Sequence, residues 1–399
     1  MGRPIVVVGA GIVGLATAYT LLRERPGTPL VVLDKEATVA GHQSGHNSGV
    51  LHSGVYYRPG SLKARLCLEG RALMLDYLRA HGLPFRICGK LIVATDPAEL
   101  PRLAELARRA RANGVPGVRS LDGPGMRDLE PEVAGTTALH VPGTGIVDYP
   151  AVARSLAEEI GRSGGEVRLT SPVERIRMQA NGVEVVTGHE SVEGSFLVNA
   201  GGLQADRLAR LAGLEPLCRI VPFRGEHYVL GARGAGLVRG LVYPVPDPDL
   251  PFLGVHLTPR VDGSVEAGPN AVLALAREGY RRSDVDWADL LETLVYPGLL
   301  PMARRFWRSS VDEGFRSLSK GLFLRSLQRL LPGLMASDLG PWGSGVRAQA
   351  LGPGGELFDD FLLLRAARGL HVLNAPSPAA TSSLAIGRYL VERIPSMAG

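Results

Sequence analysis

Short apolar runs and a helical pattern alternate at the start of the chain. Residues 4–8 (PIVVV) and 30–33 (LVVL) are apolar throughout, which is typical of strands buried on both faces. Between them, residues 12–24 carry small and apolar side chains on one side of a helix. The sequence therefore predicts a β-α-β unit whose two strands are parallel.

A different pattern fills the middle of the chain. Apolar and polar residues alternate in 166–170, 173–178 and 183–187, and the turn residues Asn181-Gly182 separate the last two runs. This alternation predicts a small antiparallel sheet. Four later runs predict the strands of a second sheet: residues 217–231, 240–245, 252–258 and 264–268.

Further helices and strands complete the pattern. Helices are predicted at 61–81, at 98–113 and over most of 281–331, where bulky residues recur at helical spacing. Residues 196–200 and 370–374 predict two more buried strands. Elements near both termini therefore resemble parts of one parallel sheet, with other segments inserted between them.

Composition limits the class of protein without selecting a function. With 45% hydrophobic and 21% charged residues, the 399-residue chain should form about two globular domains of roughly 100–200 residues each. A formal net charge of +5 is compatible with an anionic cofactor, an anionic substrate or membrane headgroups. The most basic run, Arg102–Arg111, is expected to be the solvated face of a helix, so no nucleic-acid partner is expected.

The cysteines and the apolar runs bear on the cellular setting. Cys67, Cys88 and Cys218 are far apart and form no CxxC pair, so neither a zinc site nor a disulfide framework is indicated. This favours a reducing, cytoplasmic setting. No signal peptide is visible, and no apolar run approaches the ~20 residues needed to cross a bilayer. Any contact with the inner face of the cell membrane is therefore expected to be peripheral.

A glycine-rich motif follows the first strand. Gly9-Ala10-Gly11-Ile12-Val13-Gly14 is a G-x-G-x-x-G between a predicted strand and a predicted helix. In this context Gly9 permits a tight turn, Gly11 lets the backbone approach a pyrophosphate, and Gly14 lets the helix pack on the strand. The helix N-terminus then offers free N–H groups to the phosphates. Asp34 ends the next strand, where a carboxylate accepts hydrogen bonds from a ribose diol and repels the extra phosphate of NADP. This unit predicts a bound dinucleotide.

The C-terminal segment favours FAD over NAD. Residues 375–383 (APSPAATSS) lead into a helix that starts near Ala379, with Ser377 expected as its N-cap and Pro378 in its first position. A second helix N-terminus, ringed by hydroxyls, would stabilise the negative charge of a reduced flavin. Residues 198–202 (VNAGG) can touch the adenylate, and Val173 can reach the adenine with backbone groups. We therefore expect FAD as the cofactor.

These elements define the expected architecture. We predict an α/β (α+β) fold with an FAD-binding Rossmann-like domain that is discontinuous in sequence, comprising residues 1–85, 145–215 and 335–399. An inserted domain with a mixed or antiparallel sheet, comprising residues 86–144 and 216–334, is expected to bind the substrate.

Residues 41–60 (GHQSGHNSGVLHSGVYYRPG) form the loop expected to carry the chemistry. The spacings of His42, His46 and His52 fit no usual metal pattern, and no metal is expected. Small residues would let this backbone follow a flavin, while His52 faces the substrate, since an imidazole can accept a hydroxyl proton near neutral pH. The residues expected to contact the cofactor are Gly9, Gly11, Ile12, Val13, Gly14, Asp34, Lys35, Ser44, His46, Asn47, Ser48, Val173, Ala200, Gly201, Pro378, Ala379, Ala380, Thr381 and Ser382.

Long motifs recur from one end of the chain to the other. They are GAGIVGL (9–15), HNSGVLHSGVYYRPGSLKARLC (46–67), PFRGEHY (222–228), YPVPDPDLPFLGVHLTPRVDGS (243–264), GPNA (268–271), GVRAQ (345–349) and NAPSPAATSSLAIG (374–387). Together with Asp34 and Asp359-Asp360, they resemble the L-2-hydroxyglutarate dehydrogenases, also called oxidases, of the D-amino-acid oxidase superfamily. The resemblance implies oxidation of the (S)-hydroxyl of 2-hydroxyglutarate to 2-oxoglutarate with non-covalent FAD. It also implies that electrons pass towards a membrane quinone pool; the sequence itself leaves oxygen, a quinone or an electron-transfer protein open as the acceptor.

The motifs contain five candidates for catalysis or substrate binding: His52, His256, Arg347, Arg224 and Tyr57. A dicarboxylate substrate needs cationic partners, and the planar guanidinium of arginine is favoured, which makes Arg65 a further candidate. Either histidine could be the base; we favour His52, with His256 as a substrate contact.

Two other functions stay open at this point. A related flavoenzyme would oxidise another 2-hydroxy acid, an amino acid or an amine by the same hydride transfer. A non-catalytic FAD-binding or assembly protein is the second alternative, but the histidine loop and the arginine motifs argue against it.

Overall fold

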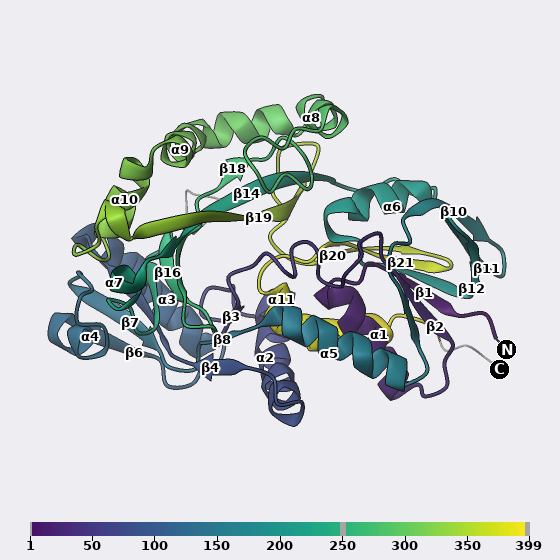
Figure 1. Cartoon of the computed structure of the whole chain (residues 1–399), viewed down its shortest axis with the longest axis horizontal. Coiled ribbons are helices and arrows are strands. Elements are labelled where there is room, and N and C mark those ends of the chain that lie inside the picture. Colours follow the sequence, from purple (N-terminus) through teal and green to yellow (C-terminus); the bar gives the residue numbers. More distant parts are fainter. Residues whose placement is uncertain (1, 248–252, 396–399) are drawn as a thin grey trace.

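The computed structural model describes residues 2–247 and 253–395 and contains two large sheets with helices packed around them (Figure 1). The strands are β1 (Ile5–Val8), β2 (Leu30–Leu33), β3 (Val50–Leu51), β4 (Phe85–Ile87), β5 (Lys90–Ala94), β6 (Arg119–Asp122), β7 (Thr137–Val141), β8 (Gly145–Val147), β9 (Glu166–Arg168), β10 (Val173–Gln179), β11 (Gly182–Thr187), β12 (Ser191–Gly194), β13 (Phe196–Asn199), β14 (Arg219–Leu230), β15 (Leu241–Pro244), β16 (His256–Pro259), β17 (Val265–Gly268), β18 (Val272–Leu273), β19 (Leu339–Leu351), β20 (Leu362–Ala366) and β21 (Gly369–Asn374). The helices are α1 (Ile12–Glu24), α2 (Leu62–Ala80), α3 (Leu100–Ala112), α4 (Gly123–Leu129), α5 (Tyr149–Arg162), α6 (Ala205–Leu211), α7 (Ala232–Ala235), α8 (Trp287–Leu294), α9 (Leu299–Leu318), α10 (Lys320–Gln328) and α11 (Ala379–Val391), with short 3₁₀ turns at η1 (Pro97–Glu99), η2 (Gly202–Gln204) and η3 (Ala336–Asp338).

The first sheet draws its strands from both ends of the chain, as predicted. Its order is β20-β21-β13-β1-β2-β9, and all neighbours are parallel except β20 and β21. Helices α1, α2, α5 and α11 share one apolar core with one face of this sheet, while α6 and the antiparallel β10-β11-β12 sheet cover the other (Figure 1). Burial on both faces explains why the strands read as continuous apolar runs.

The glycine loop makes close backbone contacts that larger residues would prevent. Gly9 has φ +111°, and a Cβ there would lie 2.5 Å from the carbonyl oxygen of Ala200. A Cβ on Gly14 would lie 1.9 Å from the carbonyl oxygen of Gly9, so α1 can pack against the loop only with glycine at this position.

The second sheet has nine strands and is formed mainly by the inserted segments. Its main path is β18-β14-β17-β16-β15-β5-β7-β6, and β19 pairs antiparallel with β14 along most of its length. Helices α8 and α9 run along the outer side of β14 and β19 (Figure 1). The prediction assigned residues 335–399 to the FAD-binding domain; β19, which lies in this range, pairs with β14 of the second sheet.

Several predicted details are wrong or lie outside the described residues. Residues 166–168 were predicted in the antiparallel sheet, but they form β9, which pairs with β2 at the edge of the parallel sheet. An edge strand with one exposed flank shows the same alternation as a hairpin strand, and this similarity explains the wrong prediction. The N-cap of α11 is Pro378, which was predicted in the first helical position, rather than Ser377. Residues 248–252, which include part of one motif and the start of the strand predicted at 252–258, lie outside the described residues; β16 begins at His256.

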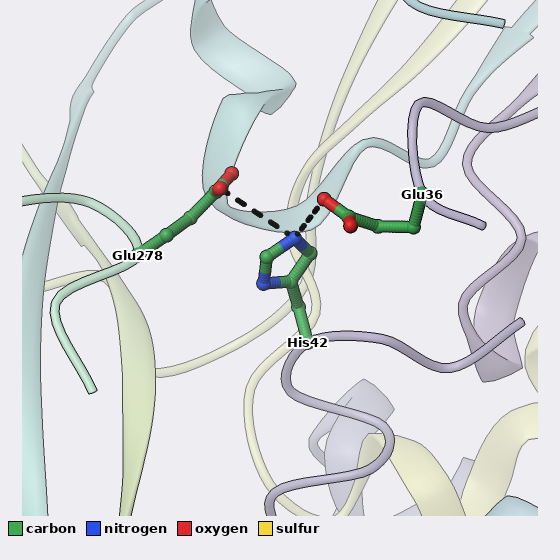
Figure 2. Close-up of side chains that lie close together, drawn as sticks. All are labelled: Glu36, His42 and Glu278. Carbon is green, nitrogen blue, oxygen red and sulfur yellow. Dashed lines mark hydrogen bonds and ion pairs between the residues drawn. The ribbon is translucent and has the colours of Figure 1, made fainter. Parts of the chain in front are cut away.

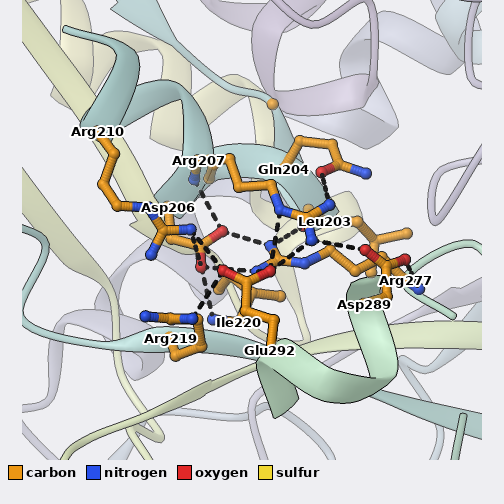
Figure 3. A network of polar contacts seen from close by, with 12 residues as sticks. Leu203, Gln204, Asp206, Arg207, Arg210, Arg219, Ile220, Arg277, Asp289 and Glu292 are labelled. Atoms are coloured by element: carbon orange, nitrogen blue, oxygen red, sulfur yellow. Dashed lines mark hydrogen bonds and ion pairs between the residues drawn. The ribbon is translucent and has the colours of Figure 1, made fainter. Parts of the chain in front are cut away.

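An ion-pair network joins the two halves of the molecule (Figure 3). Arg277, 2% exposed, donates to the fully buried carboxylate of Asp206 on α6, with an Nη2–Oδ2 distance of 2.9 Å. Glu292 on α8 accepts from Arg210 at 2.8 Å and from Arg219 at 2.7 Å. Removing one member would leave buried charge uncompensated, at a cost of about 3–5 kcal/mol. The network therefore fixes α8 relative to α6.

Within residues 2–247 and 253–395, none of the helices combines the length and the apolar character that crossing a bilayer requires.

Candidate active site

One cavity of about 1140 Å³ is lined by residues of both sheets. Most residues expected to contact the cofactor lie on its wall: Gly9, Gly11, Ile12, Val13, Asp34, Lys35, Ser44, His46, Asn47, Ser48, Val173, Ala200, Gly201, Pro378, Ala379, Ala380 and Thr381. Gly14 and Ser382 are not part of the wall. Gly14 instead permits the packing of α1, and Ser382 is buried inside α11.

The wall at the start of α1 is shaped by backbone hydrogen bonds. The backbone N–H of Ala10 donates to Asp34 Oδ2 at 2.6 Å, and that of Glu36 donates to Oδ1 at 2.9 Å. Ser44 Oγ accepts from the N–H of Ile12 at 2.9 Å. The carboxylate of Asp34 is thereby held at the cavity beside the glycine loop, where a ribose would bind.

A second helix N-terminus opens into the same cavity. Ala379, Ala380 and Thr381 in the first turn of α11 line it. Thr381 Oγ1 accepts from the backbone N–H of His52 at 3.0 Å and donates to the carbonyl of Val50 at 3.1 Å, which fixes the histidine loop to α11. Two helix N-termini, a close-packed glycine loop and an acidic strand end fit a flavin dinucleotide.

The three histidines of the loop have separate surroundings. His42 Nε2 lies 2.9 Å from Glu36 Oε1 and 3.6 Å from Glu278 Oε2, and Figure 2 shows the two carboxylates converging on this ring. Their ligand atoms are close enough to hold a metal ion, but Lys35 Nζ contacts Glu36 and lies 3.0 Å from both His42 Nε2 and Glu278 Oε2. The lysine already supplies a positive charge at this position.

Contacts of His46 and Asn47 fix the middle of the loop formed by residues 41–60. The ring of His46 packs tilted against that of Tyr280, with 4.3 Å between ring centroids. The Asn47 side chain donates to the carbonyl of Ser44 at 2.7 Å and accepts from the N–H of Gly49 at 2.8 Å. These bonds occupy the amide that was expected to reach the flavin, so Asn47 shapes the loop at the cavity wall.

His52, directly after β3, and His256, on β16, both line the cavity. His52 is half-buried, and burial together with the positive charges of Lys90 and Lys63 holds its pKa well below the usual range. His256 is 5% exposed, and burial lowers its pKa to about 3. The Nδ1 of His256 lies 2.8 Å from the carbonyl oxygen of Gly254 and must donate to it, which leaves Nε2 as an acceptor. The lowered pKa values favour the uncharged form of both imidazoles, so each ring keeps a nitrogen lone pair that can accept a hydrogen bond.

Two cations line the cavity near these histidines. Arg347 on β19 lines the cavity and lies across Gly225 of β14. A Cβ on Gly225 would lie 3.3 Å from the guanidinium of Arg347. Burial lowers the pKa of Arg347 to about 10. Lys63, on the first turn of α2, also lines the cavity, and burial lowers its pKa. Arg65 is exposed instead, because two residues along a helix turn a side chain by about 200°.

Arg224 and Tyr57, two predicted substrate contacts, are not part of the cavity wall. Arg224 is buried and donates to Glu226 at 3.0 Å and to the carbonyl of Arg281 at 3.1 Å. Tyr57 lies close to Ser377, which does line the cavity. Both residues lie behind the wall, and their contacts support β14 and the segment before α11.

Sequence reasoning missed Lys90 and Tyr243. Lys90 on β5 is 2% exposed, and its Nζ lies 3.8 Å from the centroid of the Tyr243 ring. Tyr243 in turn stacks on His256 with 3.8 Å between centroids. Burial lowers the pKa of Lys90 to about 7. A lysine in an apolar strand (KLIVA) is the only signal in the sequence that could have singled it out.

Comparisons with known proteins agree with this arrangement. The family model described as FAD dependent oxidoreductase matches residues 4–393. The chain is 45% identical to an L-2-hydroxyglutarate dehydrogenase of Indibacter alkaliphilus, over 98% of each chain. It is 44% identical to the protein of that name from Escherichia coli strain K12, over 98% of this chain and 93% of the other.

A solved structure supports the fold. The L-α-glycerophosphate oxidase of Mycoplasma pneumoniae, dithionite-reduced and with FAD bound, superposes with a TM-score of 0.81 at 23% identity, covering 98% of this chain and 94% of that one. The expected fold class, the cofactor FAD and the resemblance drawn from the motifs are therefore confirmed. The chain belongs to the family of FAD-dependent oxidoreductases, in the group whose members are named L-2-hydroxyglutarate dehydrogenases.

Proposed function

We propose that this enzyme oxidises the hydroxyl-bearing carbon of L-2-hydroxyglutarate and releases 2-oxoglutarate. The observation that carries the proposal is the convergence of two uncharged histidines and the cations Arg347 and Lys63 on one cavity. A dianionic substrate matches two cations, and an alcohol requires a base. The substrate named for the relatives at 44–45% identity has both features.

The residues of the chain have distinct proposed roles. Arg347 and Lys63 bind the carboxylates and orient C2. His52, which is fixed to α11 through its backbone, accepts the hydroxyl proton, and His256 on β16 holds the substrate oxygen. FAD, when bound, supplies the acceptor for the hydride from C2. A developing alkoxide releases hydride more readily than an alcohol, so proton removal assists the step.

Anaerobic mixing tests the proposed substrate. L-2-hydroxyglutarate should bleach the visible absorbance of the purified enzyme, whereas D-2-hydroxyglutarate and amino acids should not. Bleaching by an amino acid alone would favour the related amine- or amino-acid-oxidising function instead.

The mode of flavin attachment is a separate proposal. We expect FAD to be bound non-covalently, so acid precipitation should release the yellow colour into the supernatant. Colour retained in the pellet would show a covalent bond.

The acceptor of the electrons is proposed to be a quinone or oxygen. Oxygen uptake and the reduction of a soluble quinone analogue, measured with the same enzyme preparation, distinguish the two. A quinone acceptor would require contact with a membrane, and we propose that this contact is peripheral, on the cytoplasmic side.

A further inference from the structure

Large apolar side chains gather on the exposed surface of α8 and α9. Among the described residues, ten large apolar side chains that are at least 41% exposed lie between residues 285 and 318: Val285, Trp287, Leu291, Leu294, Val295, Leu300, Trp307, Val311, Phe315 and Leu318. Trp287 and Leu318 are the most exposed of them, at 77% and 79%. We call this group the α8–α9 apolar face. Folded monomers rarely leave such a cluster in water.

Helix α8 has its polar side chains turned inward. Asp289 is buried and accepts from Arg207 at 2.6 Å, and Glu292 belongs to the ion-pair network of Figure 3. Trp287, Leu291 and Leu294, at i, i+4 and i+7, point outward. A helix that packs on a protein core normally has the opposite arrangement.

Helix α9 repeats this inversion. Its inner side holds Ser317, which donates to Glu226 at 2.6 Å, and Glu313, which accepts from the N–H of Ala271 at 3.1 Å. Its outer side presents Trp307, Val311, Phe315 and Leu318 at successive spacings of four, four and three residues, which places them in one stripe. Figure 1 shows α8 and α9 together along one edge of the molecule.

Positive charge borders the apolar stripe. Arg304, Arg305 and Arg308 are exposed on α9, and the Arg308 guanidinium lies 5.3 Å from the centroid of the Trp307 ring. Within residues 285–318, which carry the face, the exposed charged side chains are Arg304, Arg305 and Arg308 against Asp286 and Asp312, because Asp289, Glu292 and Glu313 turn inward. Apolar residues, exposed tryptophans and flanking arginines are the combination that binds the interface of an anionic bilayer.

We propose that the α8–α9 apolar face docks on the surface of an anionic phospholipid bilayer. The inference specifies the surface responsible for the peripheral contact proposed above, and it does not depend on the identity of the substrate. A second copy of the chain is a poorer partner, because a two-fold interface through this face would bring its arginines close to those of the other copy.

The test uses the FAD-loaded enzyme and vesicles of phosphatidylcholine with or without phosphatidylglycerol. Three variants are compared: Trp307→Ser with Phe315→Ser and Leu318→Ser; Arg304→Gln with Arg305→Gln and Arg308→Gln; and, as a matched control, Leu217→Ser with Ile87→Ser, which removes exposed apolar side chains elsewhere. Sedimentation with vesicles measures binding, and light scattering measures the oligomeric state. Flavin content and dye-coupled oxidation of L-2-hydroxyglutarate report folding and catalysis separately.

The wild type and the Leu217/Ile87 control should sediment with the phosphatidylglycerol vesicles. The serine variant should lose on the order of tenfold in affinity for each side chain removed from the interface. The glutamine variant should lose about fivefold for each arginine and should bind both vesicle types alike. Flavin content and dye-coupled activity should not change in any variant.

Three results would overturn the inference. One is wild-type enzyme that binds neither vesicle type. Another is equal loss of binding in the control and the serine variant. The third is a dimer that only the serine variant dissociates, which would show that a second copy covers this face. If the wild type shows no dye-coupled oxidation of L-2-hydroxyglutarate, that result would instead count against the proposed substrate.

Discussion

The two walls of the cavity are built by different physical means. The wall formed by the first sheet uses backbone groups, glycines and helix N-termini, supplied by short segments such as Gly9–Val13 and Pro378–Thr381. The wall formed by the second sheet uses side chains, among them Tyr243, His256 and Arg347. The first wall suits a cofactor common to many enzymes. The second carries two of the side chains proposed to bind the substrate, His256 and Arg347.

The largest expected effect lies where the two walls meet. His52→Ala should slow anaerobic flavin reduction by about 10²- to 10⁴-fold, because the substrate hydroxyl loses its base. FAD occupancy, measured by absorbance, should not change. His189→Ala, which alters an exposed histidine, is the matched control. If His256→Ala shows the large loss and His52→Ala does not, the two roles are exchanged; wild-type rates in both variants would require a different base.

A change on the substrate wall should act on binding. Arg347→Ala should raise KM by roughly 10- to 150-fold, because a hydrogen bond to a charged group is worth about 1.5–3 kcal/mol. For the shorter analogue 2-hydroxybutyrate, which has one carboxylate, removal of at least one of the two cations, Arg347 or Lys63, should raise KM less than it does for L-2-hydroxyglutarate. Arg65→Ala, on the exposed side of α2, is the control for steady-state kinetics. A fall in kcat at unchanged KM would contradict a binding role.

A change on the cofactor wall should leave substrate recognition intact. Asp34→Ala removes the carboxylate that lies beside the glycine loop and should weaken FAD binding by about 1.5–3 kcal/mol. Titration of apoenzyme with FAD measures this, with Asp76→Ala on the exposed side of α2 as control. Unchanged FAD affinity in the Asp34 variant would mean that the adenosine half binds elsewhere.

The smallest effect concerns the buried lysine. Because burial lowers the pKa of Lys90 from 10.5 to about 7, the unfolded chain binds more protons than the folded chain between these values. The free energy of unfolding should therefore rise with pH in this window, by at most about 1.4 kcal/mol per pH unit from this group. Lys90→Met should flatten that slope in urea unfolding measured from about pH 7 to 9, whereas Lys320→Met, at an exposed position, should not. Parallel slopes for the wild type and the Lys90 variant would show that Lys90 stays charged.

The difference between the two walls also explains how much could be predicted from sequence. The glycine loop, the strands beside it and α11 depend on local backbone requirements, and the bounds predicted for α1 and β2 match those of the structure. The wall formed by the second sheet depends on pairing between strands that are far apart in the sequence. Strand β19 was not predicted, and its pairing with β14 is what brings Arg347 to the cavity.

Side-chain direction on the substrate side could not be derived from the motifs either. Lys63 and Arg65 share one motif, and only the helical register of α2 selects the lysine. Arg224 lies in another motif, but the buried carboxylate of Glu226 holds it away from the cavity. A motif therefore indicated which segments meet at the site and left open which side chains face the substrate.

The most direct test of the whole account is single-turnover stopped-flow with L-2-hydroxyglutarate carrying hydrogen or deuterium at C2. The account predicts that the flavin absorbance bleaches fully, that each flavin yields one 2-oxoglutarate, and that deuterium slows the bleaching. No bleaching, or bleaching without 2-oxoglutarate, would contradict it.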